Sequence, residues 1–195
     1  MKGEMTVARY RAIDLTLFAA ILAVFETVIV NAATRWFPNE PYTVSAVPAV
    51  VAIVMMRWGP WAAIHAALGG LVTCFAFRAG AQQYAVYIAG NLLGLGALAM
   101  RRTLGAEKIR GDAFLTVVFG LIAALLMQLG RAAVSLLFGA APVEAAGFLT
   151  TDVITLLFTA VIVWIARHLD GVFEDQKHYL TRVSEERERE KGGFQ

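Results

Sequence analysis

Apolar residues fill six long runs of this chain, and polar or charged residues mark the ends of most of them. About 20 apolar residues in a helix cross the hydrocarbon of a bilayer, so these runs predict membrane-spanning helices. The predicted spans cover about 14–33, 43–56, 58–77, 82–100, 113–138 and 148–166. The second run is short but, together with Pro41 and Tyr42, is long enough for a thin or tilted helix that ends at Arg57.

The pattern predicts an all-α fold, a six-transmembrane-helix bundle with a charged C-terminal cytoplasmic helix. We expect residues 1–167 to form the membrane domain and residues 168–195 to form the charged tail. This tail carries seven acidic and five basic residues. A solvated helix is its simplest interpretation, and a helix that docks a partner is the alternative.

Composition agrees with burial in lipid rather than with a soluble fold. Hydrophobic residues make up 58% of the chain and charged residues 16%, whereas soluble domains are about 25% charged. The lipid bilayer is therefore the expected surrounding, and no nucleic-acid partner is expected. The one cysteine, Cys74, excludes an internal disulfide.

The basic residues between the spans predict the orientation of the bundle. Nine lie on the side of the termini: Lys2, Arg9, Arg11, Arg57, Arg101, Arg102, Lys108, Arg110 and Arg167. Only Arg35 and Arg78 lie in loops on the other side. Because basic loops stay on the cytoplasmic side, both termini should be cytoplasmic.

A few polar residues lie inside the spans or within a turn or two of their ends: Glu26, Asn91, Gln128, Arg131 and Asp152. A charge in hydrocarbon costs roughly 2.5–3.5 kcal/mol on insertion scales, so such residues usually face the protein interior and often mark a site. With about 1.5 Å of rise per residue, all five fall in the outer half of the membrane. Tyr84 and Tyr87 fall in the outer third. The sequence therefore predicts a polar site that opens outward.

Two interpretations of this polar set stay open. Arg131 could form an ion pair with Glu26 or Asp152 and fasten the bundle with no ligand involved. A ligand site is the other interpretation, because Asn91, Gln128 and the two tyrosines offer more hydrogen bonds than one pair needs.

No sequence motif supports catalysis. The chain has no phosphate-binding glycine loop, nucleophile elbow or metalloprotease motif, so we expect neither an enzyme nor a cofactor. His65 and Cys74 have no companions at metal-ligand spacing, so a packing role is expected for both and no metal site is predicted. Spacings such as Ala19–Ala23 and Gly90–Gly94 predict close helix contacts.

Two stretches carry a resemblance to a known family. The first is DLTLFAAILAVFE at 14–26, which holds Ala19 and Ala23, and the second is MMRWGPWAAIHAALGGLVTCF at 55–75. With six short spans in under 200 residues, the chain resembles the substrate-binding S components of energy-coupling factor (ECF) vitamin transporters. The resemblance covers about 14–166. Glu26 and the length of the charged tail depart from the family pattern.

The resemblance implies a prokaryotic cell-membrane protein that captures a vitamin or related micronutrient from outside. Its partners would be a membrane coupling subunit, met by Ala19 and Ala23, and two cytoplasmic ATPases. The family's pocket implicates Trp36 as well as Tyr84, Tyr87, Asn91, Gln128, Arg131 and Asp152, and Glu26 is a further candidate. Riboflavin, folate or pantothenate-like molecules are compatible cargoes. The alternative function is a membrane scaffold that docks partners through its charged tail.

Overall fold

The computed structural model describes residues 6–38 and 43–192, and every regular element within them is a helix. The α-helices are α1 Val7–Trp36, α2 Val47–Trp58, α3 Ala62–Phe77, α4 Ala81–Leu92, α5 Leu98–Leu104, α6 Ala106–Gly111, α7 Ala113–Leu137, α8 Pro142–Thr150, α9 Val153–Ala166 and α10 Gln176–Gly192. Two 3-10 helices, η1 Gly59–Trp61 and η2 Leu93–Ala97, join α2 to α3 and α4 to α5. The all-α prediction is confirmed for the described residues.

Five helical stretches among the described residues are long and apolar enough to cross a membrane. They are Val7–Trp36, Val47–Phe77, Ala81–Leu104, Ala113–Leu137 and Pro142–Ala166. Their length and composition are compatible with a membrane protein. This count does not confirm the six spans predicted from the sequence. The difference lies in Val47–Phe77, which the prediction divides into two spans.

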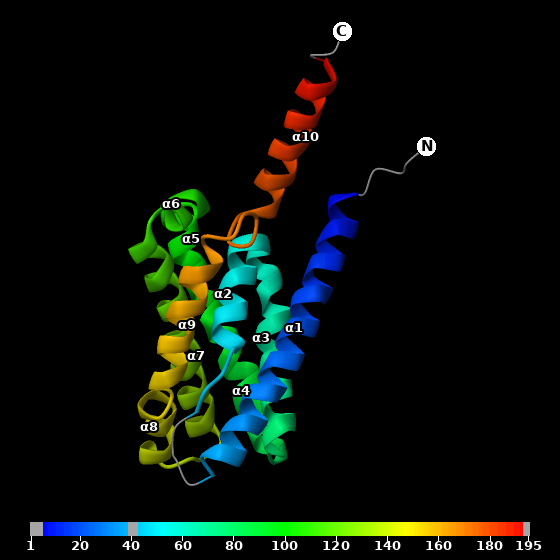
Figure 1. Cartoon of the computed structure of the whole chain (residues 1–195). Coiled ribbons are helices and arrows are strands. Elements are labelled where there is room, and N and C mark those ends of the chain that lie inside the picture. The colour runs from blue at the N-terminus through cyan, green and yellow to red at the C-terminus, as the bar shows by residue number, and fades with distance from the viewer. Residues whose placement is uncertain (1–5, 39–42, 193–195) are drawn as a thin grey trace.

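The stretch Val47–Phe77 turns back on itself at η1. Gly59, where α2 ends, has a φ of +60°, a conformation that favours glycine. Beyond this turn α3 returns alongside α2. Gly69 of α3 lies so near Val47 of α2 that a Cβ added to Gly69 would be 2.4 Å from the Val47 side chain. The 12 residues of α2 span only about 18 Å, against a hydrocarbon core of about 30 Å. The N-terminus of α2 consequently lies at mid-height in the bundle (Figure 1).

The two ends of the bundle differ in what they carry. The N- and C-terminal segments lie at one end, which we call the termini end, and α10 projects beyond the bundle there (Figure 1). The other end carries α8 and the turn between α3 and α4, and we call it the α8 end.

A buried ion pair fastens the termini end. Arg57 donates from Nε and Nη2 to the two carboxylate oxygens of Asp14, at 2.8 and 2.6 Å. Trp58 Nε1 donates to the same carboxylate at 2.6 Å, and Arg57 also donates to the carbonyl of Gly171. Phe173 is fully buried nearby and meets Phe119 edge-on. These contacts hold α1, α2 and the linker before α10 together.

Glycines allow α4 and α7 to meet backbone to backbone. A Cβ added to Gly130 would lie 2.2 Å from the carbonyl oxygen of Gly90, and one added to Gly90 would lie 2.5 Å from Arg131 N. Small residues at helix contacts permit this close approach in membrane proteins. The contact brings Asn91 on α4 beside Arg131 on α7.

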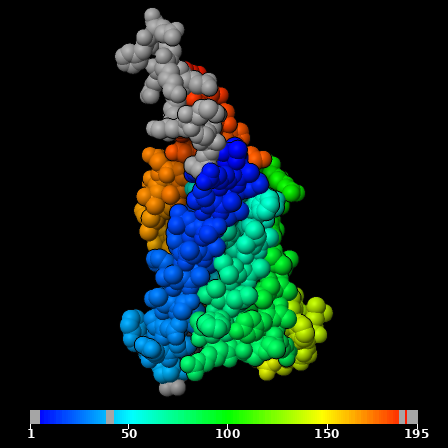
Figure 2. Space-filling view, turned by 90° about the vertical axis from the view of Figure 1, so that its right-hand side faces the viewer, coloured from blue at the N-terminus to red at the C-terminus, as the bar shows by residue number. Residues whose placement is uncertain are grey.

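One face of the bundle is formed by α1, α3 and α4 (Figure 2). Large apolar side chains of α1 are exposed on the surface: Ile13, Leu17, Ile21, Val24, Phe25 and Val28. Ala19 and Ala23 are half-buried on the same helix. An apolar exposed surface of this kind suits contact with lipid or with another membrane protein.

We predict that Gly130→Ala destabilises the bundle, because its methyl group would overlap the Gly90 carbonyl and force α4 and α7 apart. Overpacking of this kind typically costs about 1–3 kcal/mol. The measurement is the free energy of unfolding in mixed micelles. Gly111→Ala is the matched control, since a Cβ there meets nothing within 4 Å. Equal stability of the two variants would contradict the close contact.

Candidate functional site

Buried polar residues from α4, α7 and the α8–α9 junction meet in one cluster. Arg131 Nε donates to Asn91 Oδ1 at 2.8 Å, and its Nη1 lies 3.4 Å from Asp152 Oδ2. Gln128, one turn before Arg131, donates from Nε2 to the same Asp152 oxygen at 3.1 Å. The exposed fractions are 4% for Arg131, 2% for Asp152, 1% for Gln128 and 0% for Asn91. The structure therefore brings these four predicted site residues together.

A break between two helices places Asp152 in this cluster. The stretch Pro142–Ala166 is not one continuous helix, because α8 ends at Thr150 and α9 begins at Val153. Asp152 lies between them and receives hydrogen bonds from Thr155 Oγ1 and Thr43 Oγ1, the latter at 2.6 Å. A buried carboxylate with several donors and one cation remains satisfied without water.

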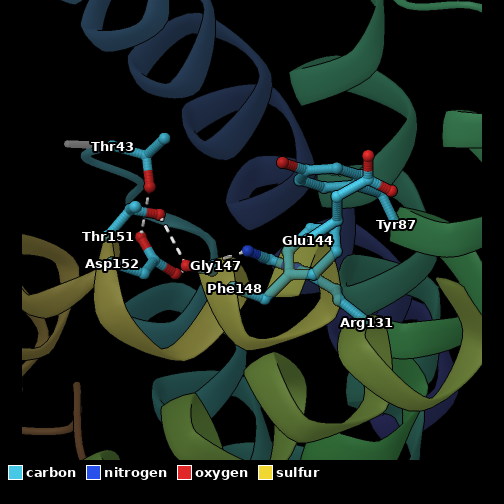
Figure 3. Close-up of a pocket in the computed structure, with 8 residues that line it drawn as sticks. All are labelled: Thr43, Tyr87, Arg131, Glu144, Gly147, Phe148, Thr151 and Asp152. Carbon is cyan, nitrogen blue, oxygen red and sulfur yellow. Dashed lines mark hydrogen bonds and ion pairs between the residues drawn. The ribbon is translucent and has the colours of Figure 1, made fainter. Parts of the chain in front are cut away.

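A cavity of about 220 Å³ lies beside the cluster. Its walls come from Thr43 before α2, Tyr87 of α4, Arg131 of α7 and residues of 144–152 (Figure 3). The Arg131 guanidinium carbon lies 4.7 Å from the centre of the Tyr87 ring, and Tyr87 meets Phe148 edge-on at 5.9 Å. We call this space the Arg131 cavity. It presents both aromatic and charged surfaces to a small molecule.

Two buried polar atoms near the cavity have no hydrogen-bond partner among the described residues. They are Arg131 Nη2, which is a donor, and Gln128 Oε1, which is an acceptor. An unpaired buried polar atom costs about 1–3 kcal/mol, so such atoms usually meet water or a ligand. Because Arg131 lines the cavity, its free nitrogen suits an acceptor atom of a bound molecule.

The charges that line the cavity do not favour an anion. Arg131 is balanced by Asp152, and the exposed carboxylate of Glu144 adds a second negative charge. The lining therefore carries one positive and two negative side chains. A neutral or cationic molecule fits this balance better than an acidic one.

Glu26 belongs to a separate network. It is fully buried and accepts hydrogen bonds from Ser45 Oγ at 2.8 Å, from the backbone N of Ala46 at 2.8 Å and from Thr73 Oγ1 at 2.7 Å. Ala46 is the N-cap of α2, so this carboxylate lies at the positive end of a helix that begins inside the bundle. Of the two pairs considered for Arg131, the one with Asp152 forms, and Glu26 caps α2 instead.

The segment before α2 links the two networks. Ser45 donates to Glu26 through its hydroxyl, and its backbone N donates to Thr155 Oγ1 at 3.1 Å. Two residues earlier, Thr43 N donates to the carbonyl of Thr151 at 3.1 Å. The chain entering α2 is thus fastened to the wall of the Arg131 cavity.

Two aromatic residues predicted for the site lie outside the cavity lining. Trp36, the last residue of α1, is 75% exposed. Tyr84 is half-buried on α4, about one turn before Tyr87, and is not among the described residues that line the cavity. The loop residues 39–42 that follow Trp36 lie outside the described residues.

His65 and Cys74 are buried and are not among the described residues that line the cavity. His65 Nε2 lies 3.0 Å from the carbonyl oxygen of Leu15, and Cys74 is a free thiol. Within 6–38 and 43–192, no three His, Cys, Asp or Glu side chains gather as metal ligands would.

Sequence reasoning missed the hydroxyl residues of the site, because a hydroxyl does not stand out within an apolar sequence as a charge or an amide does. Thr43, Ser45, Thr73 and Thr155 supply most of the hydrogen bonds to Glu26 and Asp152. Hydroxyl residues are common in membrane helices, where they bond their own backbone. Their only signal in the sequence is the clustering of Thr43 and Ser45 just before an apolar run.

Comparison of the chain with protein families, with curated proteins and with solved structures finds no match. The interpretation of the cavity therefore rests on its own residues and geometry. Membership of the ECF S components stays a prediction from the sequence.

We predict that Asp152→Ala strongly destabilises the protein, because it leaves the buried Arg131 guanidinium without its carboxylate. Breaking a buried pair in this way costs about 3–5 kcal/mol. A second substitution, Arg131→Met, should restore part of the loss by removing the unpaired charge. The free energy of unfolding of the two single variants and the double variant measures this coupling.

Glu144→Ala is the control for this cycle, since Glu144 also lines the cavity but is exposed. Glu144 Oε2 accepts a hydrogen bond from Ala141 N at the start of α8, and losing such a cap typically costs about 1 kcal/mol. If Asp152→Ala were as mild as Glu144→Ala, the pair would not be holding the helices together.

Proposed function

We propose that this chain is the substrate-binding S component of an ECF-type importer in a prokaryotic cell membrane. The observation that carries the proposal is the Arg131 cavity, which combines a buried ion pair, a free guanidinium nitrogen and two aromatic rings. An ion pair that served only as a fastener would need neither the cavity nor the unpaired donor.

The proposed orientation follows from the basic residues. Among the described residues, eight basic residues before α10 lie at the termini end, against Arg35 and Arg78 on the other side. With the termini in the cytoplasm, the Arg131 cavity would open to the outside. The charged C-terminal helix α10 would then extend into the cytoplasm.

The proposed topology has six passes. The stretches α1, α2, α3, α4–α5, α7 and α8–α9 alternate in direction in Figure 1, and α1 begins at the end from which α10 projects. Residues 43–46, just before α2, would extend the second pass, because α2 itself is too short to cross. Chain that is not helical is tolerated at this depth only inside the protein, which matches the hydrogen bonds of Thr43 and Ser45.

The cargo would be small and either neutral or cationic. The cavity of about 220 Å³ is below the 300–1,000 Å³ typical for drug-sized ligands, so it would hold a compact molecule or one end of a larger one. The rings of Tyr87 and Phe148 suit a flat heterocycle. Of the compatible cargoes, neutral riboflavin fits the charge balance better than the acidic folate and pantothenate.

Energy for import would come from partners. The sequence lacks a nucleotide-binding motif, so two cytoplasmic ATPases would hydrolyse ATP and a membrane coupling subunit would join them to this chain. The exposed apolar side of α1, with Ala19 and Ala23 half-buried along it, would offer the coupling subunit a smooth surface.

A second candidate function is a non-transport membrane scaffold. The observation that favours it is α10, a strongly polar helix that projects beyond the bundle and would dock a partner (Figure 1). In that case the Arg131–Asp152 pair would serve packing alone.

Ligand binding by the full-length protein in detergent tests the proposal. Thiamine, riboflavin and pantothenate serve as cationic, neutral and anionic probes, and mass spectrometry identifies any molecule that co-purifies. We expect Tyr87→Ala to weaken binding of the retained molecule about tenfold or more, since base stacking on an aromatic ring is worth about 1–3 kcal/mol.

Tyr84→Ala is the matched control, because Tyr84 lies on the same helix but not in the cavity lining. It should leave the dissociation constant unchanged. A protein that binds no small molecule, or one in which both tyrosine variants bind equally well, would overturn the importer proposal. Loss of a protein partner on removing 177–195, with no ligand bound, would support the scaffold.

A further inference from the structure

A second, larger cavity lies at the termini end of the bundle. Its volume is about 900 Å³, which is within the range for cavities that hold drug-sized ligands. Residues of α5, α6, the end of α9, the linker before α10 and α10 itself line it. We call it the basic cavity. It shares no lining residue with the Arg131 cavity.

Positive charge dominates the lining of this cavity. Six cationic side chains face three acidic ones, so the lining carries a net charge of +3 before its two histidines are counted. The cationic residues are Arg101, Arg102, Lys108, Arg110, Arg167 and Arg182.

The acidic residues neutralise only part of this charge. Asp175 pairs with Arg101, and Glu174 pairs with Arg110 at 3.1 Å and with Arg182 at 3.2 Å. Among the described residues, the three remaining cationic side chains form no ion pair. They are Arg102, Lys108 and Arg167. In addition, Arg101 Nε is buried and has no hydrogen-bond partner within the described chain.

Packing does not account for this arrangement. Basic residues are expected on the cytoplasmic side of a membrane protein, but that preference does not require them to surround a hollow. Like charges gathered around one space repel each other, and an anion placed between them removes the repulsion. The arrangement is therefore that of a site for a multiply charged anion.

We infer that the basic cavity binds a phosphate-bearing ligand. Guanidinium groups donate two parallel hydrogen bonds to phosphate oxygens, and Lys108 adds a point charge. His168 and His178 also line the cavity and add ring nitrogens as hydrogen-bonding groups. A phosphate held there would bridge α5 and α6 to α10, so binding would also fasten the polar C-terminal helix to the bundle.

Phosphate could reach this site on a soluble molecule or on a lipid headgroup, and the test separates the two sources. Full-length protein in neutral detergent is titrated calorimetrically with inorganic pyrophosphate and with ATP. In parallel, protein in nanodiscs of equal phosphatidylglycerol and phosphatidylcholine is extracted, and the retained lipids are quantified by mass spectrometry.

The test variant combines Arg102→Gln, Lys108→Gln and Arg167→Gln, which removes charge from the cavity without breaking any described ion pair. The control combines Arg9→Gln, Arg35→Gln and Lys177→Gln, an equal loss of charge at exposed residues outside the lining. In the test variant neither α10 nor the Arg131 cavity loses a described hydrogen bond or ion pair, and Arg167→Gln removes a long hydrogen bond, 3.5 Å, to the carbonyl of Gly111.

We expect pyrophosphate or ATP to bind, and the test variant to bind at least about tenfold more weakly than the control, because charge-assisted hydrogen bonds are lost. If the soluble probes do not bind, preferential retention of phosphatidylglycerol that only the test variant loses would support the inference with a lipid as the source. If no probe distinguishes the test variant from the control, the inference is overturned.

Discussion

One constraint governs this structure: a charged side chain buried among apolar helices must find its partners inside the protein. The Asp152 carboxylate meets that constraint with groups from three segments. It receives hydrogen bonds from Thr43, Gln128 and Thr155 and pairs with Arg131. Because these donors come from the segment before α2, from α7 and from α9, one carboxylate determines how those elements lie against each other. Their separation would leave several buried polar groups without hydrogen-bond partners.

The rest of the bundle is arranged around this requirement. Gly90 and Gly130 bring α4 close enough to α7 for Asn91 to bond Arg131. The break between α8 and α9 leaves Asp152 between two helices rather than on the side of one. In the neighbouring network, the buried Glu26 carboxylate likewise joins two segments, because it accepts a hydrogen bond from Ala46 N and so caps α2 inside the bundle. The Arg131 cavity exists because these constraints hold the helices in place without filling the space beside Arg131.

Hydropathy predicts which segments are apolar helices and how deep each polar residue lies, and much of the site followed from depth. Asn91, Gln128, Arg131 and Asp152 were predicted together because each is expected in the outer half of the membrane. Depth does not give the rotation of a helix about its axis, so Tyr84 could not be separated from Tyr87, which lies about one turn further along α4. Trp36 was expected at the site, and at 75% exposure it lies at the surface.

The short α2 and its capping by Glu26 could not be predicted from the sequence, for a different reason. A run of apolar residues does not reveal whether a helix crosses the whole membrane or begins halfway through it. Both kinds of buried helix have the same apolar sequence pattern. The ion pair of Asp14 and Arg57 was missed since both residues lie near predicted span ends, where charges normally face water. Only tertiary packing shows that they are buried together.

The account depends most on the Arg131 cavity being open to water on the face opposite the termini. Labelling with a membrane-impermeant maleimide tests this directly, using Phe148→Cys at the cavity wall in a Cys74→Ser background. In intact cells the Phe148→Cys variant should react, whereas Ser184→Cys on α10 should react only after the cells are permeabilised. If the Phe148→Cys variant stays unreactive in both conditions, or reacts only after permeabilisation, the cavity does not open to the outside and the account fails.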